Sequence, residues 1–225
     1  MMSLLLACVT KIDYFCDKTR RQMKSIHQKV IDQVRKFERG SILFPEQFEH
    51  LGSNEAVRQS LSRICREGII IRLSRGVYLY PVIDKELGVM YPSVDKVAQA
   101  ISERDKSRII PTGLSALNIL GLSAQIPMKV TYLTDGIPRK IKIGNQTINF
   151  KKTAPKNLAF QGKWMPLIVF ALKEIGKDNI KDNDLKKIQQ ALSQENKEVI
   201  LSDICLAPHW IREIILSLVN STGNE

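Results

Sequence analysis

The side chains whose types and spacing point most clearly to a chemistry are arginines between residues 58 and 75. They recur first at helical spacing and then beside a glycine turn: Arg58, Arg63, Arg66, Arg72 and Arg75. A guanidinium group offers a rigid fork of N–H donors that fits phosphate oxygens and base edges. Gln59 and Ser62 add neutral hydrogen-bonding groups on the same face. The pattern predicts a surface that binds double-stranded DNA.

Two amphipathic segments must position the first three of these arginines. Pro45 suits the first turn of a short helical segment, which ends at Gly52. Ser53 or Asn54 can cap the next helix through a side-chain oxygen. That helix has an apolar face formed by Ala56, Val57, Leu61 and Ile64. Its opposite face is polar and rich in hydrogen-bond donors, as a helix in a major groove requires.

A hairpin with a basic turn follows the second helix. Gly68 ends the helix, and Ile69–Leu73 and Val77–Tyr80 are predicted to pair around Arg75-Gly76. An apolar stripe over residues 24–38 predicts a further helix ahead of both segments. This order of elements is typical of a winged helix-turn-helix, which lays one helix and one hairpin on duplex DNA.

The predicted DNA-binding residues differ in role. Arg58, Gln59 and Ser62 are expected to face base edges. Ser53 and Asn54 complete the set at the start of the helix. The remaining arginines are expected to hold phosphates: Arg63, Arg66, Arg72 and Arg75. The alternative hypothesis is a winged helix that binds an acidic protein partner without DNA, and a solvated surface helix could carry the same few arginines.

The run GSNEAVRQSLSRICREGIIIRLSRGVYLYP resembles the N-terminal winged helix of the AbiEi-type antitoxins of bacterial type IV toxin–antitoxin systems. Those domains typically contain Gly-Ser, Ala-Val-Arg, an apolar helix, Gly-Ile and then Arg-Leu-x-x-Gly-Val-Tyr. The matching positions here are Gly52, Ser53, Ala56, Val57, Arg58, Leu61, Gly68, Ile69, Arg72, Leu73, Gly76, Val77 and Tyr78. The similarity continues through PTGLSALNILGLSAQIPMKVTYLTDG and covers roughly residues 24–160.

The resemblance implies a DNA-binding transcriptional autorepressor that is also the antitoxin of an abortive-infection system. Such a protein would counter a nucleotidyltransferase-like toxin and repress the operon that encodes both. Members of that family do not require a stable toxin–antitoxin complex, so the cognate toxin is a less direct partner than DNA. The implied operator carries inverted repeats, which two copies bind as a homodimer on DNA.

The net charge limits which classes of partner are expected, and the cysteine pattern indicates the cellular compartment. Lys and Arg number 34 against 23 Asp and Glu, and this net charge of +11 favours a polyanionic partner. The four cysteines and three histidines are dispersed without metal-ligand spacing. Neither a metal nor a cofactor is therefore predicted, and reduced thiols in the cytoplasm are expected. Ser3–Val9 is apolar but too short to cross a bilayer, so no membrane partner is predicted.

The sequence contains none of the common catalytic motifs. GxxxxGK[ST], GxGxxG, GxSxG and HExxH are all absent. A nucleotidyltransferase needs an Asp-x-Asp soon after its Gly-Ser, but here that pattern occurs at Asp182–Asp184, far from Gly52-Ser53. We therefore predict that the protein is not an enzyme. Catalysis on the second domain is the third hypothesis, behind DNA binding and protein binding.

A basic sheet is predicted after the winged helix. Residues 130–134, 139–143 and 147–151 have the alternation of strands in a small antiparallel sheet. Its cations are predicted to form a second basic surface: Arg139, Lys140, Lys142, Lys151 and Lys152. This surface either contacts the DNA backbone or an acidic partner, or is the solvated outer face of a β meander.

The predicted fold class is α+β, with an N-terminal winged helix-turn-helix, a mixed domain with a small antiparallel sheet, and a helical C-terminal part. Pro81 and Pro92 bracket a connecting segment without strong periodicity. The predicted parts are a loose N-terminal extension (1–22), the winged helix-turn-helix domain (23–82), the α+β domain with the basic sheet (92–163) and a helical region packed on that second domain (164–225).

Overall fold

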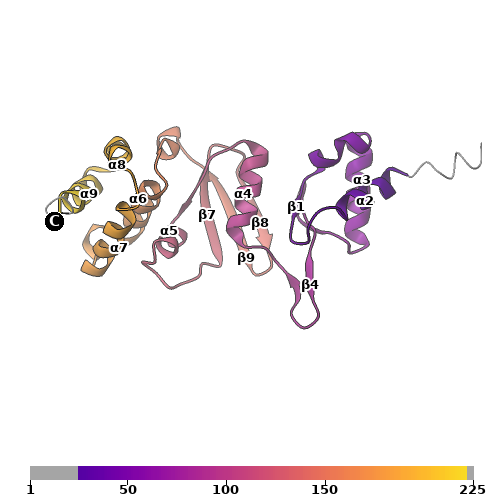
Figure 1. The fold of residues 1–225 in the computed structure, drawn as a ribbon, viewed down its shortest axis with the longest axis horizontal. Helices are drawn as coiled ribbons and strands as arrows, with labels where there is room; N and C mark the ends of the chain where they lie inside the picture. The colour runs from indigo at the N-terminus through magenta and orange to yellow at the C-terminus, as the bar shows by residue number, and fades with distance from the viewer. Residues whose placement is uncertain (1–24, 222–225) are drawn as a thin grey trace, which may run out of the picture. The chain divides into compact units, whose positions relative to one another are not determined.

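The computed structural model describes residues 25–221 of the chain (Figure 1). Helices and small sheets both contribute, so the protein is of the mixed α+β class, as the sequence predicted. The chain forms two compact units, and the boundary between them falls between Tyr91 and Pro92. The loose extension expected over residues 1–22 lies outside the described residues.

The first unit combines helices with short antiparallel strands. Its described elements are α2 (Ile26–Val34), β1 (Ile42–Leu43), the 3₁₀ helix η1 (Pro45–Leu51), α3 (Asn54–Arg66), β2 (Ile71–Ser74), β3 (Val77–Leu79), β4 (Val82–Asp84) and β5 (Gly88–Met90). Ser53 starts α3, because its hydroxyl accepts the Ala56 backbone N–H at 3.4 Å. Of the two residues that the sequence offered as the cap of this helix, the structure uses Ser53 and not Asn54.

Two details of the first unit differ from the sequence expectations. The helix predicted over residues 24–38 ends at Val34, and the segment between residues 44 and 51 forms a 3₁₀ helix. The short helical segment ends at Gly52 as predicted, and the Gly52 φ of 170° is extended backbone. A Cβ at Gly52 would lie 2.8 Å from Ile26 Cδ1, so glycine at this position allows α2 to pack closely against the backbone.

A three-stranded antiparallel sheet completes the core of the first unit. Its strand order is β1-β3-β2, with Ile42 opposite Leu79 and Arg72 opposite Tyr78. The register shifts between Arg72 and Ser74, which marks a bulge at the tip of the hairpin. Apolar side chains from α2, η1, α3 and the sheet form one buried cluster, which includes Val30, Val34, Leu43, Phe48, Val57, Leu61, Ile64 and Ile70.

The segment between Pro81 and Pro92 contains a second hairpin, where the sequence shows no strong periodicity. Strands β4 and β5 pair antiparallel, with Ile83 opposite Val89. Nearly every side chain of both strands is exposed, and Ile83 keeps 60% of its surface accessible. Without a buried face there is no inward and outward alternation, so the sequence pattern did not reveal these strands.

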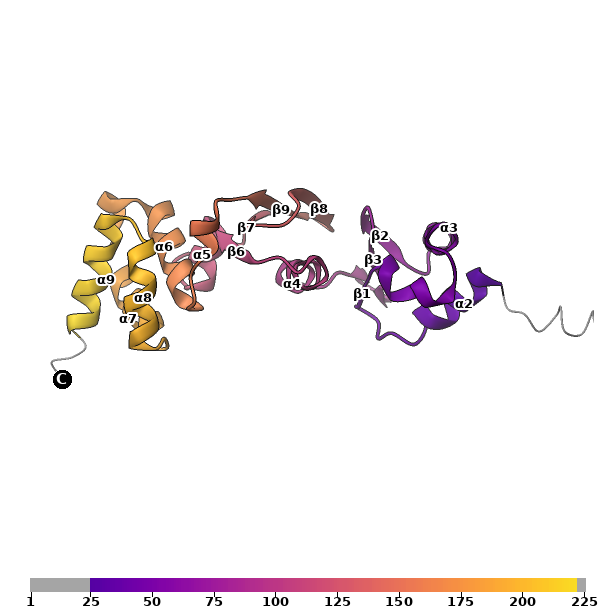
Figure 2. The same cartoon turned by 90° about the horizontal axis from the view of Figure 1, so that it is seen from above.

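The second unit combines one sheet with helix α4 and with a group of helices next to strand β6. Its described elements are α4 (Val94–Asp105), β6 (Ile109–Thr112), α5 (Leu114–Ile119), β7 (Lys129–Thr134), β8 (Arg139–Ile143), β9 (Gln146–Lys152), η2 (Pro155–Leu158), α6 (Trp164–Ile175), η3 (Lys177–Asn179), α7 (Asp182–Leu192), α8 (Lys197–Asp203), η4 (Ile204–Leu206) and α9 (His209–Ser221). Helix α4 covers one face of the sheet (Figure 2).

The sheet of the second unit is mixed, so the predicted antiparallel sheet is wrong at one pair of strands. Its strand order is β6-β7-β9-β8. Strand β9 pairs antiparallel with β8 but parallel with β7, with Val130 opposite Ile148. The reason is topological: β8 forms the edge of the sheet, and the chain returns from it between β8 and β7. A β meander would have placed β8 in that central position.

Helices α6–α9 form a second hydrophobic core together with α5. Helix α6 is its centre, because eight consecutive residues from Met165 to Leu172 are buried. Ile188, Ile200 and Ile211 bring α7, α8 and α9 onto it. Ile110 and Leu133 pack against this cluster from strands β6 and β7. Within residues 25–221, no helix is both long and apolar enough to cross a membrane.

Candidate nucleic-acid interface

Helix α3 carries most of the predicted DNA-contact residues on one face, because its other face is buried in the hydrophobic core. Val57, Leu61 and Ile64 are fully buried against α2 and the sheet. Ser60 is buried as well, whereas most polar side chains of the helix face solvent. Exposed side chains are found at Ser53, Asn54, Arg58, Gln59, Arg63 and Arg66, and Ser62 is half-buried.

Two of these polar side chains already have local partners. The Ser53 hydroxyl caps α3, so it has a structural role. The Gln59 amide donates a 3.4 Å hydrogen bond to the Glu55 carboxylate, one helical turn away. A base edge would have to compete with Glu55 for that amide. The sequence analysis did not single out Glu55, although the four-residue spacing of these two residues predicts the contact.

Charges from both α3 and β2 influence the Tyr78 phenol. Burial raises the pKa of Tyr78, and the nearby positive charges of Arg72 and Arg58 act in the opposite direction. Arg72 is also directly opposite Tyr78 in the strand register. Positive charges from both the helix and the hairpin therefore act on the same buried phenol. The sequence analysis gave Tyr78 no role in the site, and only the Arg72–Tyr78 register could have indicated one.

Cys65 lies at the same junction between helix and hairpin. Burial raises the pKa of its thiol to about 11, and Arg72 has a smaller lowering effect. Arg58, Ser62 and Cys65 have i, i+4 and i+7 spacing, so they share one face of α3. The thiol stays protonated at neutral pH and acts as an apolar packing group.

The hairpin between β2 and β3 carries the last two arginines. Arg72 is exposed, and its Nε donates to the Ser74 backbone oxygen at 3.4 Å. Arg75 is exposed at the turn, next to Gly76 with a φ of 71°. Only glycine adopts this left-handed conformation without strain, so the turn depends on Gly76.

None of the five arginines forms an ion pair with any residue between 25 and 221. This differs from Arg104 and Arg139 in the second unit, which share the Asp105 carboxylate. A guanidinium group that is not ion-paired keeps its hydrogen-bond donors available to an external anion. The exposed face of α3 and the tip of the β2–β3 hairpin thus form a cationic surface, called here the arginine surface.

The predicted second basic surface is smaller than expected. Lys140, Lys142 and Lys151 are exposed on the outer face of β8 and β9, and Lys152 is exposed at the end of β9. Arg139 instead faces inward and pairs with Asp105 of α4. Residues 139, 141 and 143 share one side of a strand, and the last two are buried isoleucines. This alternation removes Arg139 from the surface, and the strand pattern in the sequence already implied it.

Among the residues that the structure describes, no group of three or more His, Cys, Asp or Glu side chains is placed to hold a metal ion. The arrangement is that of a mixed α+β protein with an arginine surface on its first unit. Residues 29–200 match the model of a family described as a family of unknown function, DUF6088. The match spans most of the chain, so the protein belongs to that family. No curated protein matches the sequence.

Proposed function

We propose that the protein is a DNA-binding transcriptional autorepressor and antitoxin of a type IV toxin–antitoxin system that provides abortive infection. In this proposal, the domain over residues 23–82 works as a winged helix-turn-helix. Helix α3 enters the major groove, and the β2–β3 hairpin lies along the neighbouring phosphate backbone. Two copies bind the inverted repeats of an operator in the cytoplasm, and each recognises one half-site.

The observation that supports this proposal most strongly is the arginine surface. Exposed guanidinium groups that lack ion pairs within residues 25–221 extend from α3 to the tip of the hairpin. The first unit is only mildly basic, with ten Lys and Arg against six Asp and Glu over residues 24–80. Binding would therefore depend on the placement of these groups more than on bulk charge.

The proposal assigns two roles within this surface. Arg58, Gln59 and Ser62 read base edges, and Arg58 is exposed on the outer face of α3. The phosphate contacts are assigned to Arg63, Arg66, Arg72 and Arg75. Ser53 and Asn54 lie at the start of α3, where backbone N–H groups also attract phosphate oxygens.

DNA binding is tested by titrating the full chain with the DNA directly upstream of its own gene. The control is a shuffled duplex of the same length and composition, and both titrations contain excess nonspecific competitor. We expect the upstream duplex to bind at least about a thousandfold more tightly, as specific regulators do. Equal affinity for both duplexes, or no binding to either, would overturn the proposal. In that case, retention of an acidic protein would favour the interaction-module alternative.

The antitoxin role is assigned to the second unit and is tested in cells. The gene next to this one is expressed from an inducible promoter, with and without the full chain. We expect growth arrest from a nucleotidyltransferase-like product and rescue when the full chain is co-expressed. An Arg58→Ala, Arg75→Ala double variant should lose operator binding but keep the rescue. Failure of the wild-type chain to restore growth would refute the antitoxin role and leave the repressor role intact.

A further inference from the structure

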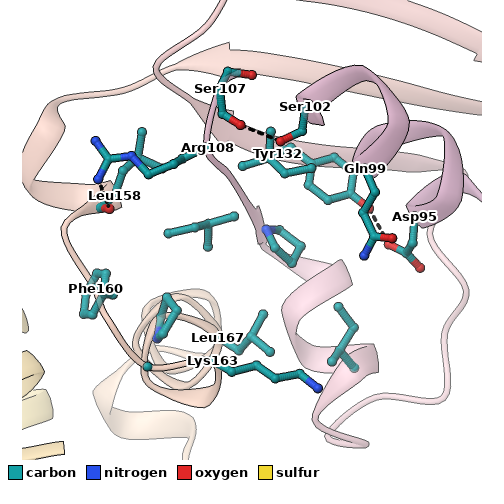
Figure 3. Close-up of a pocket in the computed structure, with 16 residues that line it drawn as sticks. Asp95, Gln99, Ser102, Ser107, Arg108, Tyr132, Leu158, Phe160, Lys163 and Leu167 are labelled. Carbon is teal, nitrogen blue, oxygen red and sulfur yellow. Dashed lines mark hydrogen bonds between the residues drawn. The ribbon is translucent and has the colours of Figure 1, made fainter. Parts of the chain in front are cut away.

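The second unit contains a cavity of about 730 Å³ next to helix α4 (Figure 3). Its lining residues come from α4, from strands β6 and β7, and from the segment that leads into α6. Small-molecule sites in proteins occupy roughly 300–1,000 Å³. The cavity is thus large enough for an organic ligand, and none of the roles discussed so far uses it.

One wall of the cavity is polar. Asp95, Gln99 and Ser102 follow i, i+4 and i+7 spacing along α4, beside the buried stripe that holds the helix on the sheet. The Ser102 hydroxyl is occupied, because it donates to the Ser107 backbone oxygen. The Gln99 amide makes no hydrogen bond with any residue between 25 and 221. Asp95 and Gln99 lie side by side at this wall, as Figure 3 shows.

Tyr132 holds the Asp95 carboxylate in place. The Tyr132 hydroxyl donates a short hydrogen bond to Asp95 Oδ1. Burial raises the pKa of Tyr132, and the hydrogen bond to Asp95 raises it further, so the phenol remains a donor. An ionised carboxylate has about four acceptor positions, and the phenol uses one of them. Asp95 therefore keeps acceptor capacity for N–H groups of a ligand, next to an amide that can donate.

Other walls of the cavity are apolar. Pro111, Leu158, Phe160 and Leu167 contribute to them, together with Ile119 of α5. Phe160 is itself held by an edge-on contact with Phe170, with ring centroids 6.5 Å apart. Planar heterocycles combine apolar faces with a hydrogen-bonding edge, and proteins read isolated bases through both features.

The positive charges at the cavity limit how much anionic charge a ligand can carry. Arg108 is engaged, because it donates to the Asp135 carboxylate and to the Leu158 backbone oxygen at 3.1 and 3.0 Å. The Gly162 and Trp164 backbone N–H groups are also taken, by the Asp203 and Glu195 carboxylates. Lys163 is exposed at the lower side of the cavity (Figure 3). Its ammonium group lies over the Trp164 ring, 5.1 Å from the centroid, and forms no ion pair with residues 25–221. This single cation suits one phosphate and not a polyphosphate.

We propose that this cavity binds a guanine base, as the nucleoside or the nucleoside monophosphate. Asp95 accepts hydrogen bonds from the N1–H and 2-amino groups, and the Gln99 amide donates to the O6 atom. The ring system packs between the apolar walls. Lys163 lies near the 5′-phosphate of the monophosphate. Adenine fits less well, because its N1 acceptor would face the Asp95 carboxylate. This site is independent of the proposed DNA binding.

The test is isothermal titration of the full chain with a series of matched ligands. Guanosine should bind saturably, and inosine, which lacks the 2-amino group, about tenfold or more weakly. Adenosine should show no saturable binding. Guanosine monophosphate should bind more tightly than guanosine, with no further gain from the triphosphate. Absence of saturable guanosine binding, or equal binding of adenosine, would overturn the proposal.

Variants distinguish direct recognition from a general effect on folding. Asp95→Asn keeps an acceptor for Tyr132 but presents an amide to the ligand, so it should weaken guanosine about tenfold and favour xanthosine, which has a 2-carbonyl group. Ile119→Trp should block the cavity and abolish binding. Lys163→Gln should remove the advantage of the monophosphate over the nucleoside.

The control is Glu103→Gln, an exposed change on helix α4 outside the cavity, which should alter none of these affinities. The same loss in Glu103→Gln as in Asp95→Asn would contradict the assignment.

Discussion

Arg58 and Arg75 carry the same charge, but the first unit holds them in different settings. Arg58 lies on the exposed face of α3, whereas Arg75 lies at the hairpin turn. Arg58→Ala should lower operator affinity by about 1–3 kcal/mol and leave affinity for the shuffled duplex nearly unchanged, because a bidentate base contact is lost. Arg75→Ala should weaken both duplexes alike. Competitive gel shifts with the two duplexes measure the difference.

The control for these variants is Lys36→Ala, which removes an exposed cation just beyond α2. It should change neither affinity nor preference. Equal losses on both duplexes from Arg58→Ala would show that this arginine holds phosphate, and the assignment of roles would then be wrong.

Cys65 gives the first unit a dependence on alkaline pH. Burial raises the pKa of its thiol from 9.0 to about 11 in the folded protein. Its contribution to stability is therefore complete below about pH 9 and is lost as the pH rises through about 11, since the unfolded thiol ionises first. The pKa of Tyr78 is raised in the same sense. Thermal unfolding midpoints between pH 8 and 11 should fall more steeply for the wild type than for Cys65→Ala.

Cys65→Ser serves as the second control for this effect, because it is isosteric and does not ionise in this range. It should flatten the pH dependence just as alanine does. An unchanged slope in both variants would assign the alkaline loss of stability to other groups.

At the scale of elements, local patterns were most informative where a buried face exists. Helix α3 was predicted because its apolar positions recur at helical spacing and Ser53 precedes them. The hairpin of β2 and β3 was predicted because Gly76 separates two apolar runs. The arginines of the site lie on these two elements, so their exposure could be inferred from the sequence.

Several features of the second unit could not be predicted from local sequence patterns. The parallel pairing of β7 with β9 joins Val130 to Ile148, and no local pattern records which strands become neighbours. The Arg139–Asp105 pair links residues 34 positions apart, and the cavity combines α4 with the start of α6. Packing of distant segments determines all three features, so the sequence alone predicted none of them.

Strand β8 offers a direct comparison of its two faces. Arg139→Ala should lower the free energy of unfolding by roughly 1–3 kcal/mol, because it removes a charged hydrogen bond to the largely buried Asp105. Lys140 is the next residue and lies on the exposed face of β8, so Lys140→Ala should lower the free energy of unfolding by less than about 0.5 kcal/mol. Urea denaturation of the two variants measures both values. Equal stabilities would mean that Arg139 is not anchored by Asp105 in solution.

At the scale of the whole molecule, the arginine surface and the lysines of β8 and β9 belong to different units. Each unit also has its own hydrophobic cluster, and the two clusters share no residue. DNA binding can therefore be confined to the first unit or can involve both. The ionic-strength dependence of binding separates these cases, because it counts the phosphates that the protein neutralises.

If two copies bind one operator through four phosphate-binding arginines each, log K should fall with log salt concentration with a slope of about −7. Arg75→Ala removes one contact per copy, so its slope should be shallower by about 2. A Lys140→Ala, Lys142→Ala double variant should keep the wild-type slope if the second unit stays off the DNA. Fluorescence anisotropy titrations at several salt concentrations measure all three slopes. A wild-type slope steeper than −7, together with a slope of about −7 for the double variant, would show that the lysines of β8 also contact the phosphate backbone.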